Sequence, residues 1–467
     1  MEKAREHKRN SNINAESQQD RKEAKANYGL LTATTMIIGI VIGSGIFFKS
    51  DDVLIYTGGD AKLGALVFCI GAFSIIFGSL TLIEFSVRTK KNGGFVGYYE
   101  DFISKRVACG FGWFQTFIYF PSVTAVVSWV ASLYIFSLFN IEAGLEAQII
   151  LGFLLMTMIY ALNIISVKVG GYFQNASTIL KLIPLIGLAI IGLFWGASNP
   201  EIPAGIEIIE KSKVGLRWVA ALTPIAYSYD GWTIATSITN EVKNPKKNMS
   251  LALVIGPLVV LGVYLMYFLG LSNMLGTEYL MSTGNNAVNK AGELILGSNG
   301  SKIIVIFVII SVLGVVNGVI LGGLRMPQAL ASKNMIPNSE KIAEIQPKVG
   351  LSLSSCFISY VTAVIWLVLH YLTQKTGILR NSDVSEISVV FSYTCYIVLY
   401  IKVIKMWKDK IVDSFFKGMI CPIFAILGSL IIFTGGIVTN PFYVIIFMIT
   451  CFIVCIAGFL YYKRTNK

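Results

Sequence analysis

The sequence predicts an all-α membrane protein of twelve transmembrane helices, and three observations lead to this fold class. Of the 467 residues, 55% are hydrophobic and only 14% are charged, whereas a soluble protein carries about a quarter charged residues. The apolar residues form continuous runs, such as 303–316, 423–433 and 444–459. With their flanks, these runs reach the roughly 20 residues that a helix needs to cross a bilayer. The third observation is the distribution of positive charge.

Lysine and arginine gather in every second connection between the predicted helices. With a cytoplasmic N-terminus, 28 of the 38 Lys and Arg residues fall on the cytoplasmic side and nine on the outer side, and Lys181 is left inside a helix. This asymmetry follows the positive-inside rule and predicts that both termini are cytoplasmic. A nucleic-acid-binding protein would concentrate its net charge of +12 on one face, so we expect no nucleic-acid partner.

The apolar runs fix the predicted spans and divide the chain into regions. The spans are 29–56, 62–87, 108–139, 147–166, 171–196, 216–239, 249–273, 300–324, 350–372, 385–405, 418–438 and 441–462. Residues 1–27 are polar and lack the apolar core of a signal peptide, so they predict a disordered cytoplasmic tail. The other regions are a first five-helix group over 28–200, a second over 210–406, and two additional helices over 417–463.

Two spans contain residues that interrupt a helix. The first span contains Gly-Ser-Gly at 43–45, where little side-chain support remains, and the sixth contains Pro224 and the turn dipeptide Asp230-Gly231. Interruptions five spans apart indicate two inverted repeats of five helices, with a solute site at the unwound backbone. Each interruption also has a structural interpretation, because Gly39-x-x-x-Gly43 fits close helix packing and Pro224 alone would be a kink.

Several short motifs resemble one family of transporters. They are Gly-Ser-Gly-Ile at 43–46, Tyr-Asp-Gly-Trp at 229–232, Glu241 with Lys-Asn-Pro at 243–245, Asn163 with Val-Lys-x-Gly-Gly at 167–171, Gln174-Asn175, Lys181-Leu-Ile-Pro, and Asn317-Gly318 with Arg325. Their order resembles the amino acid–polyamine–organocation (APC) superfamily, and within it the bacterial branch of the L-type amino acid transporters, which includes serine/threonine exchangers. The resemblance covers roughly residues 28–405 by motif. It implies a LeuT-like fold of five plus five inverted helices, with helices 1 and 6 broken, plus two C-terminal helices.

The resemblance also implies an amino acid bound between the two breaks. Backbone N–H groups at the start of the outer half-helix suit the substrate carboxylate. The candidates for this role are Gly43, Ser44 and Gly45. Carbonyl groups freed by the breaks suit the substrate ammonium. The candidates for that role are Ile40, Val41, Tyr227, Ser228 and Asp230.

Two of these side chains have more than one interpretation. By motif register, Tyr227 resembles the aromatic gate that covers the substrate from the outer side in related transporters, but a core tyrosine is the general alternative. Asp230 departs from the mammalian relatives, which tend to have glycine at this position. Its carboxylate either contacts the ammonium, favours cationic substrates, or caps the freed amides.

Lys181 lies inside the fifth span, where a lysine is costly and is therefore a functional candidate. The resemblance implies that it lies beside the first-span break, where sodium-coupled relatives hold a cation. Its ammonium would there take the place of the ion and make transport independent of sodium. Alternatively, it carries a coupling proton.

These features predict a transporter and not an enzyme. With Asp51, Asp52 and Glu386 set aside as acids at span ends, the spans contain Glu84, Asp230 and His370. No sequence pattern brings any two of these three groups together for catalysis. The seven cysteines lie in or near the spans and there are two histidines, so we expect no disulfide framework, metal or cofactor.

The predicted function is sodium-independent exchange of neutral L-amino acids by alternating access, in the bilayer of a bacterial plasma membrane. Two alternatives with the same fold stay open: proton-coupled uptake, and antiport of charged amino acids and amines. Mammalian relatives bind a glycoprotein through a cysteine in the loop between spans three and four. The corresponding residues 140–146 contain no cysteine, so we expect no disulfide-linked heavy subunit.

Overall fold

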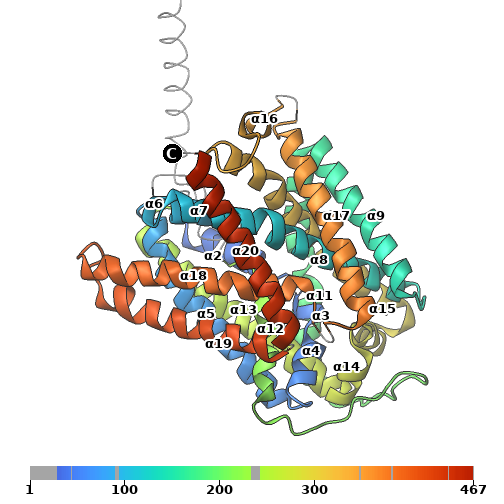
Figure 1. Cartoon of the computed structure of the whole chain (residues 1–467). Coiled ribbons are helices and arrows are strands. Elements are labelled where there is room, and N and C mark those ends of the chain that lie inside the picture. The colour runs from blue at the N-terminus through green and yellow to red at the C-terminus, as the bar shows by residue number, and fades with distance from the viewer. Residues whose placement is uncertain are drawn as a thin grey trace, which may run out of the picture.

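The computed structural model describes most of the chain and contains helices joined by connections, of which the one over 195–214 is a long loop (Figure 1). The described residues are 29–43, 45–89, 94–232, 242–346, 349–379, 382–439 and 441–465. The helices are accompanied by an isolated β-bridge between Gln346 and Leu351. The predicted tail over 1–27 and the candidate residues Ser44 and Glu241 lie outside the described residues.

Nine helical stretches in the described residues are long and apolar enough to cross a membrane. They are formed by α5 (Ala61–Ser86), α7 (Lys105–Phe114) with η1 (Gln115–Tyr119) and α8 (Phe120–Leu138), α9 (Leu145–Ile165), α13 (Pro245–Leu275), α15 (Asn286–Ala331), α17 (Leu353–Thr376), α18 (Val384–Lys408), η4 (Phe416–Ile420) with α19 (Cys421–Thr439), and α20 (Pro441–Thr465). The all-helical membrane class is therefore confirmed, while the count of twelve stays a prediction.

The three other predicted spans contain interrupted helices. The first contains α2 (Leu30–Val41), α3 (Gly45–Phe48) and α4 (Ser50–Tyr56); the fifth contains α10 (Val167–Leu180) and α11 (Leu182–Phe194); the sixth contains η2 (Gly215–Ala221) and α12 (Leu222–Ser228). The fifth interruption has a local cause in Pro184, which has no N–H to bond the carbonyl of Leu180 one turn earlier. Three short helices complete the set: α6 (Gly94–Phe102), α14 (Thr277–Thr283) and α16 (Ser339–Ala343).

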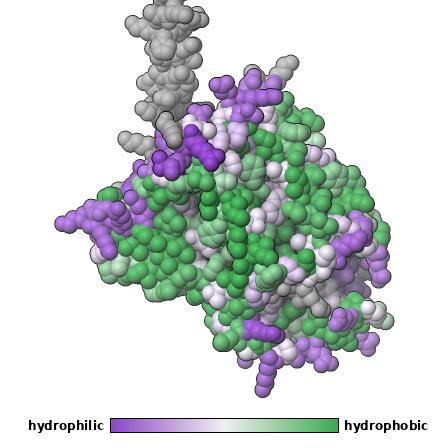
Figure 2. Space-filling model, in the orientation of Figure 1, coloured by the Kyte–Doolittle hydropathy of each residue, from purple (hydrophilic) through white to green (hydrophobic). Residues whose placement is uncertain are grey.

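The surface of the helix bundle is apolar where a bilayer would contact it. Of the nine long stretches, α9 and α20 are the least buried, and the α7–α8 stretch is the most buried. Large apolar side chains such as Ile165, Phe194 and Phe357 are more than half exposed. Figure 2 shows hydrophobic residues across the middle of one face and hydrophilic residues toward its edges. This pattern suits a bundle whose belt contacts lipid.

Candidate functional site

A cavity of about 610 Å³ lies where the two interrupted helices meet. Seven of the predicted site residues line it: Val41, Gly43, Gly45, Lys181, Tyr227, Ser228 and Asp230. Ile40 lies in α2 between Gly39 and Val41, which both line the cavity. The structure thus brings the residues of both predicted breaks, and Lys181, to one space.

The first break separates α2 from α3. Helix α2 ends at Val41, and Ile42 has an extended conformation with φ −66° and ψ 95°. Gly45, the first residue of α3, lies directly against the second break, because a Cβ atom added there would be 2.7 Å from the Cα of Ser228. Only glycine therefore lets the two broken helices approach this closely.

The second break follows α12, which ends at Ser228. The next residues form a turn, in which Gly231 has a φ of +91°, a conformation that favours glycine. The hydroxyl of Ser228 donates to the carbonyl of Pro224 at 2.9 Å, so this side chain is already bonded within its own helix. The backbone of Ser228 makes the closest approach to the other break, and its hydroxyl oxygen lies next to it, 3.1 Å from a Cβ atom added at Gly45.

Tyr264 of α13 connects the two breaks, and no sequence motif predicts this role. Its hydroxyl lies 2.9 Å from the carbonyl oxygen of Ser228 and 3.3 Å from that of Val41. These carbonyls are two of the predicted ammonium ligands. A phenol has one hydrogen, so it donates to one of them at a time. Tyr264 stands in an ordinary apolar run of the sequence, which offers no local signal for it.

Asp230 lines the cavity and accepts a hydrogen bond from the hydroxyl of Tyr119. Tyr119 is the last residue of the π-helical turn η1, a kind of irregularity that is frequent at functional sites. The turn has a sequence cause in Pro121, which cannot donate to the carbonyl of Phe117. The indole N–H of Trp366 donates to that carbonyl instead, at 2.7 Å. Pro121 could therefore have predicted this π-helical turn from the sequence.

Lys181 lies between α10 and α11 and is 4% exposed. Its Nζ donates to the carbonyl oxygen of Gly39, in the last turn of α2, at 2.6 Å. A fixed positive charge therefore bonds to the broken first helix beside the cavity.

The cavity is bounded differently on its two sides. On one side its lining reaches Phe95 in α6 and Arg325 in α15, and we call this the α6 side. On the other side, which we call the α4 side, Tyr227 is 6% exposed, and the Nζ of Lys49 lies 5.7 Å from the centre of its ring. Figure 1 shows α6 and α16 at one end of the bundle and α4 and α14 at the opposite end.

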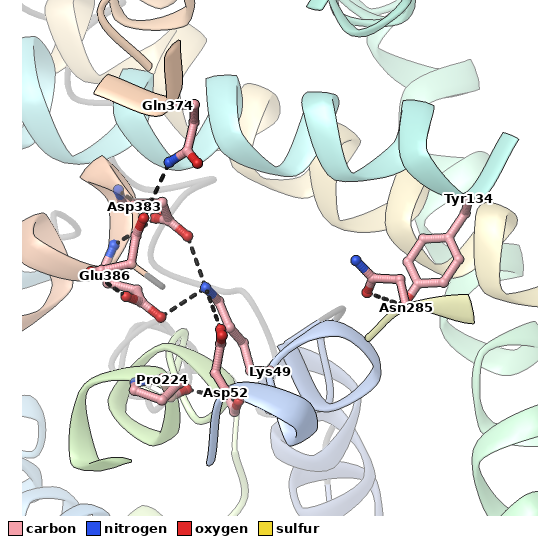
Figure 3. Close-up of polar contacts among 11 residues, drawn as sticks. Lys49, Asp52, Tyr134, Pro224, Asn285, Gln374, Asp383 and Glu386 are labelled. Carbon is pink, nitrogen blue, oxygen red and sulfur yellow. Dashed lines mark hydrogen bonds and ion pairs between the residues drawn. The ribbon is translucent and has the colours of Figure 1, made fainter. Parts of the chain in front are cut away.

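Four charged residues meet on the α4 side, and the sequence gives no pattern that joins them. The Nζ of Lys49 lies 2.8 Å from Asp383, 2.7 Å from Glu386 and 3.4 Å from Asp52 (Figure 3). We call these four residues the Lys49 cluster. Asp52 and Glu386, which were set aside above as acids at span ends, meet here because the side chain of Lys49, in the link between α3 and α4, reaches the start of α18. The available signal was Lys49 itself, a lysine within the predicted span 29–56.

Comparison with known proteins agrees with this architecture. The family model described as "Amino acid permease" matches residues 28–466. The serine/threonine exchanger SteT of Bacillus subtilis (strain 168) is 29% identical over 421 residues, which cover 89% of this chain and 92% of the relative. The b(0,+)-type amino acid transporter 1 of Mus musculus is 24% identical over 450 residues, covering 93% of this chain and 86% of the relative.

The match to the family model extends over nearly the whole described chain, and both breaks and all the long helices fall within it. The relatives are transporters and not enzymes. The chain therefore belongs to the amino acid permease family, within the APC superfamily of membrane transporters.

Proposed function

We propose that this permease exchanges neutral L-amino acids by alternating access, without sodium, in a bacterial plasma membrane. The observation that carries the proposal is that both broken helices line one cavity and contact each other through Gly45 and Ser228. Unwound backbone in a membrane protein is tolerated where it lines a cavity, and it offers N–H and C=O groups to a ligand. An α-amino acid presents the matching carboxylate and ammonium. The similarity to a relative named as a serine/threonine exchanger supports the same proposal.

The site roles in this proposal follow the two breaks. Gly43, Ser44 and Gly45 would offer N–H groups to the substrate carboxylate, and the carbonyl groups freed near Val41 and Ser228 would accept from its ammonium. Tyr227 would cover the substrate on the α4 side. The overall frame is the predicted one of twelve helices, with five-helix repeats over 28–200 and 210–406 and two additional helices over 417–463.

Sodium independence is supported by the contact of Lys181. Its ammonium bonds to the carbonyl of Gly39 at 2.6 Å, so it supplies the positive charge that a metal ion would otherwise bring to this backbone. With both termini cytoplasmic, as the charge distribution predicts, the α6 side faces the cytoplasm and the α4 side faces outward. The structure then corresponds to a state that is closed to the outside. We expect no disulfide-linked heavy subunit.

Antiport of charged amino acids and amines is the second candidate, and one observation favours it. The carboxyl group of Asp230 lines the cavity, where it would attract a substrate with an additional positive charge. The hydroxyl of Tyr119 donates to this carboxyl group and holds it at the cavity wall. Proton-coupled uptake through Lys181 remains the third candidate.

Purified protein in proteoliposomes tests these candidates. We expect labelled neutral amino acid to enter only when unlabelled amino acid is present inside, and at the same rate in sodium and in potassium buffers. Uptake into empty vesicles under an acid-outside gradient would replace exchange with proton coupling. Strong inhibition of exchange by arginine or lysine, with little inhibition by serine or threonine, would favour the charged-substrate candidate.

A further inference from the structure

The Lys49 cluster contains more buried carboxyl groups than its single ammonium balances. Lys49, Asp383 and Glu386 are 4%, 3% and 0% exposed, and only Asp52 is partly open, with a side chain 17% exposed. Within the described residues, Lys49 is the ion-pair partner of both Asp383 and Glu386. If every group were ionised, the fully buried trio would carry one uncompensated negative charge, before Asp52 is counted. An uncompensated buried charge is among the most destabilising features that a protein interior can have.

The surroundings of Asp383 favour the ionised form of its carboxyl group. Its Oδ2 accepts from Lys49 at 2.8 Å. Its Oδ1 accepts from the backbone N–H groups of Ser385 and Glu386 at 2.8 and 3.1 Å, and also from the hydroxyl of Ser385. Both oxygens therefore face donors, and the two backbone N–H groups and the ammonium cannot reverse their direction to accept, so these surroundings favour the ionised form. Lys49 and Asp383 together form a neutral pair.

Glu386 has a different environment, which suits a protonated carboxyl group. Its Oε1 lies 2.7 Å from the Nζ of Lys49, and its Oε2 lies 2.7 Å from the hydroxyl of Ser382. A hydroxyl rotates, so it can accept a hydrogen bond from a protonated Oε2 as readily as it donates to an ionised one. A proton on Glu386 therefore makes the buried trio neutral and keeps every hydrogen bond.

We propose that the Lys49 cluster binds one proton, on Glu386, each time the α4 side closes, so that closure is linked to proton concentration. The inference rests on the proposed alternating access, because Lys49 and Glu386 lie on segments that must separate when this side opens. Lys49 stands in the link between α3 and α4, whereas Asp383 and Glu386 stand at the start of α18. On separation, water reaches Glu386 and replaces its partners, and the proton returns to the solution on that side.

Other titratable groups face this site, and none is as well placed to hold the proton. Asp51 and Asp52 belong to α4 and are both half-buried, and the phenol of Tyr227 lies below Lys49. His370 of α17 is fully buried with its ring against Trp129 at 4.6 Å, and neither ring nitrogen has a hydrogen-bond partner in the described residues. An imidazolium at His370 would be unpaired, whereas the proton on Glu386 has an acceptor in Ser382.

The first measurement locates the proton. Infrared spectra of the purified full-length protein should contain the carbonyl stretch of a buried protonated carboxyl group that is missing from Glu386→Gln. The matched control is Glu146→Gln, since Glu146 is an exposed carboxylate that pairs with Lys375 at 3.0 Å. We expect the control spectrum to match the unmodified protein. Identical spectra for Glu386→Gln and the unmodified protein at every pH would overturn the assignment to Glu386, and so would the absence of the band from the unmodified protein.

The second measurement tests the linkage to closure and does not depend on transport. Amide hydrogen exchange of segments 45–57 and 382–388, corrected for the intrinsic rate, reports opening of the α4 side. Between about pH 8 and about pH 5 we expect protection to rise by up to about tenfold per pH unit, because one proton binds the closed state alone. In Glu386→Gln, which resembles the protonated state, amide protection should be high and should not change with pH. In Glu146→Gln, protection should depend on pH as it does in the unmodified protein. If amide protection changes with pH equally in Glu386→Gln and in the unmodified protein, a proton on Glu386 is not linked to closure.

A failure of the proposed transport function can be distinguished from a failure of the proposed proton site. If the proteoliposomes show no exchange while the infrared band and its pH-linked protection are both present, the transport assignment fails and the proton site stands. If exchange is robust and the band is absent, the reverse holds.

Discussion

The two sides of the central cavity are built in opposite ways. Toward α6 and around the breaks, the cavity exists because side chains and helical hydrogen bonds are absent. Gly43 and Gly45 have no side chain, and the backbone at the breaks lacks helical hydrogen bonds. Toward α4, closure comes from side chains that are present: Lys49 and its carboxyl partners fill the gap between α4 and α18. The difference teaches that an added atom disturbs the contact between the breaks, whereas closure of the α4 side depends on charged groups that can be removed. Four substitutions test this contrast.

Removal of the lysine should affect the α4 side most. Lys49→Met leaves Asp383 and Glu386 buried without their ammonium, and breaking a buried ion pair in this way typically costs about 3 kcal/mol or more, which corresponds to about 100-fold. We expect amide protection of segments 45–57 and 382–388 to fall by about that factor. Lys375→Met, which removes an exposed lysine, is the control and should leave protection unchanged. Protection within twofold of the original in Lys49→Met would mean that packing, and not the charge cluster, closes this side.

Removal of the second buried lysine acts on the cavity itself. Lys181→Ala takes away the donor that bonds the carbonyl of Gly39 at 2.6 Å. A lost hydrogen bond to a charged group is worth about 2 kcal/mol, so we expect the exchange rate in proteoliposomes to drop about 30-fold. Lys62→Ala, an exposed lysine of α5, serves as the control. An unchanged rate and affinity in Lys181→Ala would exclude the role of Lys181 as a substitute for an ion.

Addition of one methyl group should disturb the contact between the breaks. In Gly45→Ala the new Cβ would lie 2.7 Å from the Cα of Ser228, so the backbone must shift. Overpacking of this kind costs about 1–3 kcal/mol, and we expect about a tenfold loss of exchange. Gly262→Ala is matched to it, because no atom lies within 4 Å of its added Cβ. If both variants exchange equally well, the two breaks do not depend on their close approach.

Removal of one hydroxyl group should change selectivity more than rate. Tyr119→Phe frees the carboxyl group of Asp230 from its hydrogen bond. A hydrogen bond to a charged group contributes about 1.5 kcal/mol or more, so in a competition panel we expect lysine and arginine to gain about tenfold relative to serine and threonine. Tyr172→Phe, at an exposed position of α10, should leave the panel unchanged. A panel that does not change in Tyr119→Phe would indicate that Asp230 is a structural group.

The sequence predicted the cavity far better than the Lys49 cluster, for a physical reason. Glycine and proline act on the backbone next to them, so Gly43, Gly45 and Pro224 marked the breaks without any knowledge of the packing. Pro184 and Pro121 carried the same kind of signal for the two other irregularities. The pairing of Lys49 with Asp383 joins residues 334 positions apart, and no local rule predicts a contact over that separation. Tyr264 was missed because its hydroxyl matters only where two distant carbonyl groups converge.

The hydroxyl of Tyr264 has a consequence for the energetics of ligand exchange. It has one hydrogen and two carbonyl oxygens within reach, those of Ser228 and Val41, so at any moment one of the two is an open acceptor. An arriving ammonium group can bond the open oxygen while the phenol keeps the other, and no protein hydrogen bond has to break first. Departure reverses this, and the phenol again shares its one hydrogen between the two carbonyl oxygens. An exchanger, which must release one molecule before it accepts the next, gains from a site that has an open acceptor as soon as the first molecule leaves.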